Sequence, residues 1–172
     1  MKMEITIRQG SNADLEGVIG LLQDVKAAME HPEWFYLDSP EEIREMMADG
    51  TMRLWVAEDG NTLAGILYIL FPGLQEFNYG YDLGLTQEEL LRVVSMDTAA
   101  VRPEYRGMGL QGKLIQAAED SLQGESAHIL LCTIHPENVF SLNNALKQGY
   151  VVQKEVPKYG STRYVLRKNL KK

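Results

Sequence analysis

The sequence predicts an α/β fold of the α+β kind, with helices flanking a mixed, mostly antiparallel sheet of about six or seven strands. Short stretches of alternating apolar and polar residues recur along the 172-residue chain, and amphipathic stretches of helical length stand between several of them. The apolar strands expected at 93–101 and 127–134 are joined by a helix, as parallel neighbours require. We expect residues 1–172 to form a single domain, because this length is typical of one domain.

The N-terminal half predicts the order strand, helix, helix, strand, strand. A strand is expected at 4–10 and a helix within 11–30. The apolar stripe of this helix consists of Leu15, Val18, Ile19, Leu22 and Val25. In the next helix Ser39 and Glu42 form a capping box, and Gly50 marks the end. The two strands that follow are 52–59 and 62–71, joined by a hairpin-type turn at Asp59-Gly60-Asn61.

The C-terminal half begins with a long loop, 72–92, that is rich in aromatic residues and glycine. Loops of this length are often functional. Within it, Thr86 and Glu89 form a capping box for a short helix. The further elements expected are a strand at 93–101, a helix from Gly109 to about Gln123, a strand at 127–134, a helix from about Asn138 to Gln148, and closing strands at 150–156 and 163–169.

The composition excludes several classes of partner. The chain has 17 basic and 24 acidic residues, a net charge of -7, whereas a nucleic-acid-binding domain needs a basic surface. The longest apolar run, 63–71, is too short for the roughly 18 residues of a membrane span, so we expect no membrane partner. The lone cysteine, Cys132, and the absence of a signal-peptide pattern suit a cytoplasmic location. The three histidines have no metal-ligand spacing, so we expect no metal.

The stretch VRPEYRGMGLQGKL, 101–114, is similar to two phosphate-binding patterns. It lacks the hydroxyl that a nucleotide triphosphatase uses to bind Mg²⁺, because Leu114 stands there and belongs to the apolar stripe of the following helix. It lacks the tight turn of a dinucleotide site, and the next strand does not end in an acidic residue. What remains is an anion site, formed by glycine backbone, a helix N-terminus and the charge of Arg106.

The same residues resemble the acetyl-CoA loop of the GNAT superfamily of N-acetyltransferases, in which Arg or Gln, two residues, Gly, one residue and Gly or Ala follow each other. Residues 106–110 fill this pattern, and at its last position Gln111 replaces the small residue of the family. A second stretch, HPENVFSLNNALKQGYVV, resembles the family's N-x-x-[AS] helix and its K-x-G-F ending. Its matching residues are Asn138, Ser141, Lys147, Gly149 and Tyr150.

The resemblance covers nearly the whole chain and implies a single N-acetyltransferase domain, in which strands 93–101 and 127–134 are parallel and splay apart at one end. It implies transfer of an acetyl group from acetyl-CoA to a primary amine of a small molecule or peptide, by direct attack on the thioester. The implied cofactor-binding residues are Ala99, Val101, Arg106, Gly107, Met108, Gly109, Leu110, Gln111, Gly112, Asn138 and Ser141. Asn138 is alternatively a helix cap only.

Asp97 is the expected general base, because it is the one carboxylate within an otherwise apolar strand and such a setting raises a carboxyl pKa. A structural role for Asp97 is the alternative. Many family members have a tyrosine as general acid where this chain has Ala145. The identity of the general acid is therefore open. The missing tyrosine also leaves a second function open, that of a non-catalytic domain that binds or senses acyl-CoA. The tyrosines that could replace it are Tyr150, Tyr159 and Tyr164.

Three further residues are assigned from their surroundings in the sequence. Cys132 is expected to be a core residue rather than a nucleophile, since it lies within an apolar strand. Trp34 and Asp82 are candidates for binding the acceptor, the first by lining its pocket and the second by attracting a cationic amine. The sequence leaves the oligomeric state open, and a homodimer is one of the states that it allows.

Overall fold

The computed structural model describes residues 4–170, which form two units by the contacts between their residues. Unit 1 contains residues 4–69 and 98–121, and unit 2 contains residues 70–97 and 122–170. Strand β4 (Val93–Val101) passes through both, since the division falls after Asp97.

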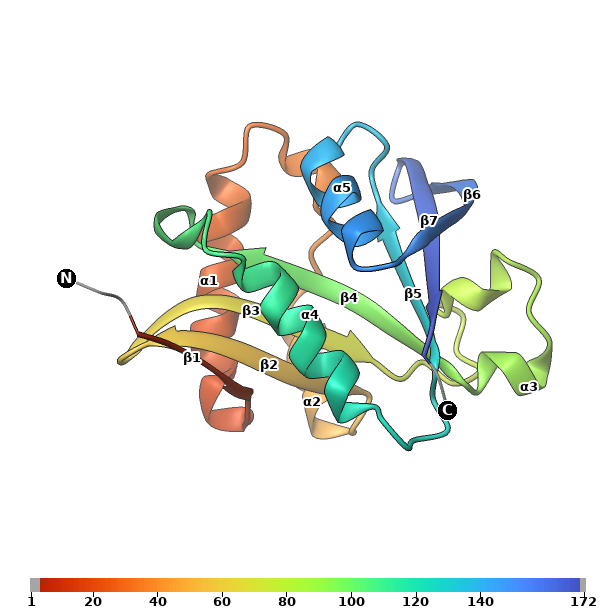
Figure 1. Cartoon of the computed structure of the whole chain (residues 1–172), viewed down its shortest axis with the longest axis horizontal. Coiled ribbons are helices and arrows are strands. Elements are labelled where there is room, and N and C mark those ends of the chain that lie inside the picture. Colours follow the sequence, from red (N-terminus) through yellow and green to blue (C-terminus); the bar gives the residue numbers. More distant parts are fainter. Residues whose placement is uncertain (1–3, 171–172) are drawn as a thin grey trace. The chain divides into compact units, whose positions relative to one another are not determined.

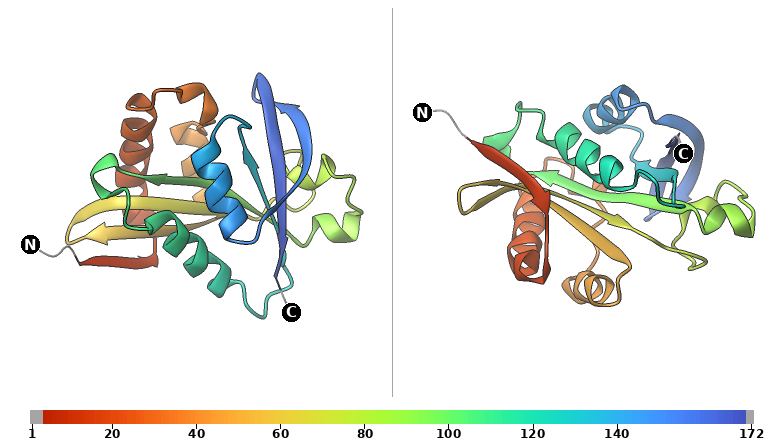
Figure 2. Two further views of the ribbon diagram at one scale, coloured as in Figure 1. Left: turned by 45° about the horizontal axis from the view of Figure 1, so that its top comes forward. Right: turned by 60° about the horizontal axis from the view of Figure 1, so that its bottom comes forward.

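Unit 1 is a sheet covered by helices on both faces. Its strands are β1 (Ile5–Gln9), β2 (Met52–Asp59), β3 (Thr62–Leu70) and the C-terminal part of β4, adjacent in that order. Its helices are α1 (Leu15–Ala27), α2 (Pro40–Ala48) and α4 (Leu110–Ser121). Figure 1 labels these elements, and the right-hand view of Figure 2 shows α1 and α2 on one face of the strands and α4 on the other.

The helices of unit 1 form where their apolar stripes and caps predict them. All five stripe residues expected in α1 are buried. Leu110, Leu114 and Ala118 of α4 are at most 2% exposed, so this helix packs through one face. The Ser39 hydroxyl accepts the Glu42 N–H and the Glu42 carboxylate accepts the Ser39 N–H, which confirms the predicted capping box of α2.

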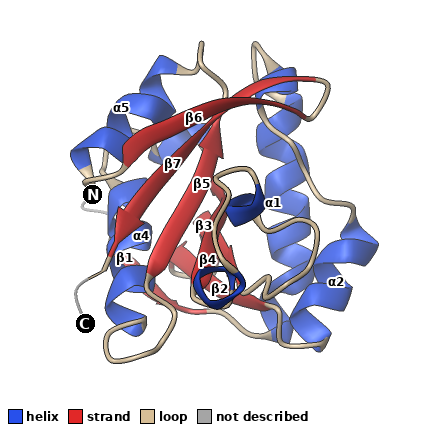
Figure 3. Cartoon of the chain, turned by 90° about the vertical axis from the view of Figure 1, so that its right-hand side faces the viewer, coloured by secondary structure: helices blue, strands red, loops and turns tan. Residues whose placement is uncertain are grey.

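Unit 2 contains the N-terminal part of β4, followed across its sheet by β5 (Ile129–Ile134), β7 (Ser161–Asn169) and β6 (Val151–Lys158) (Figure 3). Its helices are α3 (Gln87–Leu90) and α5 (Val139–Lys147). The β4 and β5 strands are parallel, whereas β5 pairs with β7 and β7 with β6 in antiparallel fashion. Because β4 is shared, the seven strands follow the order β1-β2-β3-β4-β5-β7-β6, which confirms the predicted mixed sheet.

The β6–β7 hairpin is longer than the sequence predicts. Its strands continue through Pro157↔Thr162 to Lys158↔Ser161, and only Tyr159 and Gly160 remain in the turn. Both turn residues have positive φ, 56° and 75°, as a type I′ turn requires. Sequence patterns missed this extension because proline is rare in central strands and tyrosine is rare at positive φ. The first is tolerated here because β6 is an edge strand.

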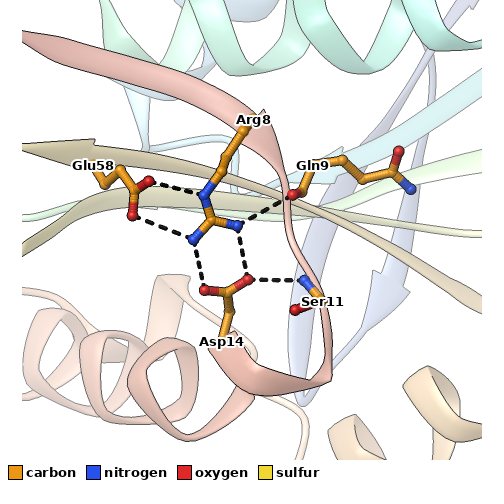
Figure 4. A network of polar contacts seen from close by, with 5 residues as sticks. All are labelled: Arg8, Gln9, Ser11, Asp14 and Glu58. Carbon is orange, nitrogen blue, oxygen red and sulfur yellow. Dashed lines mark hydrogen bonds and ion pairs between the residues drawn. The ribbon is translucent and has the colours of Figure 1, made fainter. Parts of the chain in front are cut away.

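Arg8 connects three elements of unit 1 (Figure 4). Its guanidinium donates to both carboxylate oxygens of Glu58 on β2, at 2.8 and 3.2 Å, and to both of Asp14 before α1, at 2.8 and 3.0 Å. The Asp14 carboxylate also accepts the Ser11 N–H at 2.8 Å. Hydrogen bonds from Arg8 hold the pKa of Asp14 and the pKa of Glu58 below their ordinary values.

These depressed pKa values predict a stability that depends on pH. Both carboxylates stabilise the fold above the pKa values that they have when unfolded, and this contribution disappears as pH falls through their lower folded values. Thermal unfolding from pH 7 to pH 2 should show an Arg8→Gln variant several degrees less stable at neutral pH but similar to the parent near pH 2. The control is Arg44→Gln, because the Arg44–Glu16 pair is exposed and should contribute little. Equal melting curves for the Arg8 variant and the parent at neutral pH would contradict the prediction.

Candidate functional site

The glycine turn that is predicted to bind an anion connects a short 3₁₀ helix, 103–105, to α4. Gly107 and Gly109 have φ angles of 84° and 71°, and a Cβ added at either position would meet no atom within 4 Å. The first N–H groups of α4 have no acceptor within the helix, and Arg106 is exposed beside them. The turn therefore presents accessible backbone donors and positive potential to an anion.

Two residues before the turn fix its position on the β2–β3 hairpin. Tyr105 is only 8% exposed, and its hydroxyl donates to Asp59 at 2.8 Å; this bond is the main cause of the raised pKa of Tyr105. The Arg102 N–H donates to the Ala64 carbonyl at 2.8 Å, and its Nε donates to the Leu63 carbonyl at 3.1 Å. The glycine turn thus follows a segment that is hydrogen-bonded to the β2–β3 hairpin of unit 1.

Within unit 1, the backbone of β4 has one free edge. The carbonyl oxygen of Ala100 faces β3, where it would lie 3.1 Å from a Cβ added to Gly65, and the Arg102 N–H also bonds to β3. Because the polar groups of a strand point to alternate edges, those of Ala99 and Val101 point away from β3. This orientation agrees with the prediction that both pair with an extended ligand.

In unit 2 the pairing of β4 with β5 ends early. The register runs from Val93↔Ile129 to Ser95↔Leu131, although both strands continue beyond it. Asp97 lies two residues past this point and is half-buried. Ser95, on the same face of β4 by the period of a strand, is fully buried, and its Oγ has no hydrogen-bond partner among the described residues. The strands therefore part beside two polar side chains.

A chain of hydroxyl groups leads to Asp97. The Tyr79 hydroxyl donates to Asp97 Oδ1 at 3.3 Å and lies 2.6 Å from the hydroxyl of Tyr159. Thr133 of β5 also hydrogen-bonds to Tyr79. Burial, reinforced by the charge of Asp97, raises the pKa of Tyr79 well above its ordinary value, so this phenol stays protonated at neutral pH.

The ring of Tyr79 is held in an apolar cluster of unit 2. Its members are Tyr79, Val93, Ile129, Leu131, Val156 and Val165. Lys158 lies over the ring, with Nζ 5.3 Å from the centroid, and also forms a 3.0 Å ion pair with Asp82. Asp82 is therefore not a free negative charge, because Lys158 already neutralises it.

The second sequence motif lies at the start of α5. Asn138 is the N-cap of this helix, and its side-chain oxygen accepts the Ser141 N–H at 3.3 Å. The structure thus shows the cap role of Asn138 and brings the two predicted residues together. Ala145 is buried, as is Tyr150, whose ring lies below Lys168.

The remaining candidates occupy ordinary structural positions. Trp34 of unit 1 stacks on His31 with ring centroids 4.2 Å apart. Cys132 is buried, and desolvation, with a smaller contribution from Asp97, raises its pKa to about 12, so it is a poor nucleophile. Within residues 4–170, no cluster of histidine, cysteine or acidic side chains is arranged to hold a metal ion. None of the helices in that range is both long and apolar enough to cross a membrane.

Sequence patterns did not single out the half-buried carboxylate of Asp38, in unit 1. Asp38 accepts a hydrogen bond of 2.5 Å from the hydroxyl of Tyr68, a side chain of β3 that is fully buried. Burial raises the pKa of Asp38, although the bond from Tyr68 opposes this shift. The pair joins residues far apart in the sequence, so no local pattern could reveal it.

Comparison with known proteins identifies a family for this arrangement. The sequence model of the acetyltransferase (GNAT) family matches residues 21–150. No curated protein matches the chain in sequence.

Solved structures share the fold over nearly the full length. The yncA protein of Salmonella typhimurium, solved with its cofactor acetyl-CoA, is 16% identical, with a TM-score of 0.73 over 98% of this chain and 95% of its own. NAA60 of Arabidopsis thaliana, in complex with acetyl-CoA, is 14% identical, with a TM-score of 0.76 over 97% and 99%. Ribosomal-protein-alanine N-acetyltransferase of Brucella melitensis is 19% identical, with a TM-score of 0.70 over 96% and 99%. At these identities the likeness shows the fold alone.

The burial of Cys132 predicts an unreactive thiol. With its pKa near 12, the native thiolate population at pH 8 should be smaller by about 10³-fold than that of an unfolded cysteine. Alkylation followed by mass spectrometry should therefore be slow for the native protein and fast in denaturing guanidinium chloride. An exposed thiol introduced by Ser126→Cys is the control and should react quickly in both conditions. Rapid native modification of Cys132 would contradict its placement in the core.

Proposed function

Since the chain belongs to the acetyltransferase (GNAT) family, we propose that it is an N-acetyltransferase that moves the acetyl group of acetyl-CoA to a primary amine of a small molecule or peptide. The observation that carries the proposal is the early end of the β4–β5 pairing beside Asp97. Strand edges that part in this way leave backbone donors and acceptors for a ligand, and a carboxylate at that point supplies a base.

Acetyl-CoA fits the residues of unit 1 as a co-substrate. We assign its pyrophosphate to the N–H groups of residues 107–112, with Arg106 as an additional charge. The open space where a Cβ would stand at Gly107 and Gly109 supports this assignment, because it lets a ligand approach the backbone. The free backbone groups of Ala99 and Val101 suit the amide-containing pantetheine arm, which can pair with them as a further strand would.

The reaction requires a neutral amine to attack the thioester carbonyl carbon. A carbon–nitrogen bond forms while the carbon–sulfur bond breaks, and the electron pair of the latter leaves with the thiolate. The nitrogen, which is cationic after the attack, loses its extra proton to the thiolate, so that the products are a neutral amide and free CoA. Backbone N–H groups of β4 beyond its pairing with β5 are the donors that we assign to the oxyanion. The thiolate is a tolerable leaving group without an acid, because the pKa of a thiol is near 8.5.

Asp97 accepts the proton of the acceptor ammonium, through a water molecule, in this mechanism. Its half-buried position and its bond from Tyr79 orient the carboxylate. The competing assignment for Asp97 is a structural role as the hydrogen-bond partner of Tyr79. If Asp97 is the base, turnover depends on its charge, and if it is structural, folding does.

We assign acceptor binding to Trp34 and Asp82. The indole of Trp34 is half-buried and offers a flat apolar surface. Asp82 can attract an amine only in exchange for Lys158, so its contribution is smaller than its charge alone indicates. Peptide N-termini are one acceptor class to screen, because the Brucella protein of this fold is called a ribosomal-protein-alanine N-acetyltransferase.

A non-catalytic acyl-CoA sensor is the second candidate, favoured by Ala145 at the position of the usual acid. The carboxylate and hydroxyl chain at the end of the β4–β5 pairing favours catalysis, since binding alone does not need it. Thiol release from acetyl-CoA in a screen of small amines and peptides decides between them.

Replacing Gly109 by valine should abolish most acetyl-CoA binding. A side chain there would occupy the space that the pyrophosphate needs, and valine at positive φ adds roughly 1–2 kcal/mol of strain. Gly124→Val is the matched control, because Gly124 also has positive φ (81°) and no atom within 4 Å of an added Cβ. Calorimetry should show that the Kd for acetyl-CoA is at least tenfold higher in the Gly109 variant and unchanged in the control. Equal affinities in two folded variants would place the cofactor elsewhere.

The Asp97→Asn variant should lose about 10²–10⁴-fold in turnover with little change in acetyl-CoA affinity, the range of general acid–base catalysis. Turnover and melting temperature should be measured on the same protein, with the exposed Asp120→Asn as a control. If Asp97 is only structural, the substitution lowers the melting temperature and leaves turnover near normal from pH 6 to 9.

A further inference from the structure

Tyr159 has a backbone conformation that its side chain disfavours. Among the described residues, it is the one non-glycine residue with positive φ, 56°. A bulky side chain rarely adopts this region, and Asn or Gly is favoured at this position of a type I′ turn. Such strain persists when the surroundings require it, often at functional sites. The side chain of Tyr159 therefore needs an explanation beyond turn formation.

The hydroxyl of Tyr159 is the outer end of the chain that reaches Asp97. The carboxylate of Asp97 can only accept, so the proton of Tyr79 is committed to the 3.3 Å bond between them. Either hydroxyl can donate across the 2.6 Å contact between Tyr159 and Tyr79, and Tyr159 is the donor while the proton of Tyr79 is directed at the ionised Asp97. The order of donation is Tyr159 to Tyr79 to Asp97, and both links lie within unit 2.

The two ends of the chain differ in access to water. Tyr79 is 6% exposed and Tyr159 is 36% exposed, so the hydroxyl groups connect a buried link to a side chain at the surface of the hairpin. Each ring also faces a cation, with Lys158 Nζ 5.3 Å from the Tyr79 centroid and Arg163 Cζ 5.6 Å from the Tyr159 centroid. Both cations lie over the faces of the rings, where the ring quadrupole attracts positive charge, and these contacts hold the two rings in place.

We propose that Tyr79 and Tyr159 are positioning residues that carry the acceptor's proton from Asp97 to solvent, an inference that rests on the proposed function. When Asp97 has taken the proton, its carboxyl O–H donates to the Tyr79 oxygen, and the two phenol hydroxyls turn so that Tyr79 donates to Tyr159 and Tyr159 to water. Tyr79 then takes the proton of Asp97 and passes its own proton to Tyr159. Tyr159 in turn releases its proton to water. Each phenol gains one proton and loses one, and Asp97 returns to the carboxylate without a change in the number of electrons.

The decisive variant is Tyr159→Phe, which keeps the ring and removes the outer hydroxyl. We expect kcat to fall by about 10²-fold in dilute buffer with KM nearly unchanged, and to recover in part when a small proton acceptor such as imidazole is added. Tyr81→Phe is the control, because the hydroxyl of Tyr81 donates to the Leu74 carbonyl outside this chain. Full activity of the Tyr159 variant in dilute buffer, or a loss that imidazole does not relieve, would overturn the proposal.

A second variant separates the backbone role of Tyr159 from its hydroxyl. Tyr159→Asn suits positive φ better, so its melting temperature should equal or exceed that of the parent while kcat falls as in the phenylalanine variant. An asparagine variant with unchanged kcat would show that the tyrosine side chain is dispensable and overturn the proposal.

A measurement that needs no acceptor amine can test this inference separately from the proposed function. Tyrosine NMR titration should show Tyr79 and Tyr159 ionising as a coupled pair, and Asp97→Asn should shift both. If Tyr159 titrates independently and its titration does not change in Asp97→Asn, the proposed relay of hydroxyl groups is overturned, whatever reaction the protein catalyses. If the two tyrosines titrate as a coupled pair but no amine causes thiol release, the relay of hydroxyl groups is supported. That result then counts against the acetyltransferase function alone.

Discussion

The short parallel pairing of β4 with β5 is the constraint on which the candidate site depends. Only the residues from Val93 to Ser95 have register partners on β5, and the strands then continue without each other. Buried backbone groups that lack partners are costly, so a fold with such an opening is stable when water or a ligand supplies the missing bonds. The pairing ends two residues before Asp97, the carboxylate to which we assign the role of base.

Local sequence patterns predict the elements well where one physical signal dominates. The capping box at Ser39 and Glu42 and the apolar stripe through Leu110 and Leu114 each act within one or two turns of helix, so their residue types alone identify them. The end of the β6–β7 hairpin was not predicted, because Pro157 and Tyr159 both contradict the usual preferences of strands and turns. Tertiary pairing overrides those preferences there.

The parts of the candidate site that are contiguous in sequence could be proposed from the sequence. Residues 93–114 contain Asp97, the strand residues Ala99 and Val101 and the glycine turn in one run, so the resemblance to the family was enough to propose roles for them. The partners of Asp97 were not predictable, because Tyr79 and Tyr159 are separated by 80 positions and meet only through the fold of unit 2. Tyr159 was recognised only as one of several tyrosines that could replace the missing acid.

The polar residues around Asp97 conflict with what core packing alone would select. Ser95 is fully buried without a hydrogen-bond partner among the described residues, where alanine or valine would avoid the cost of an unsatisfied hydroxyl. Tyr79 places a hydroxyl at the edge of an apolar cluster, and Tyr159 adds backbone strain beside it. The unsatisfied hydroxyl of Ser95 and the strained backbone of Tyr159 are two violations of local rules in the surroundings of one carboxylate. Such violations are expected where a protein binds or transforms a ligand. The same reasoning separates Asp97 from Asp14, whose charge is matched by Arg8 and whose surroundings contain no comparable strain.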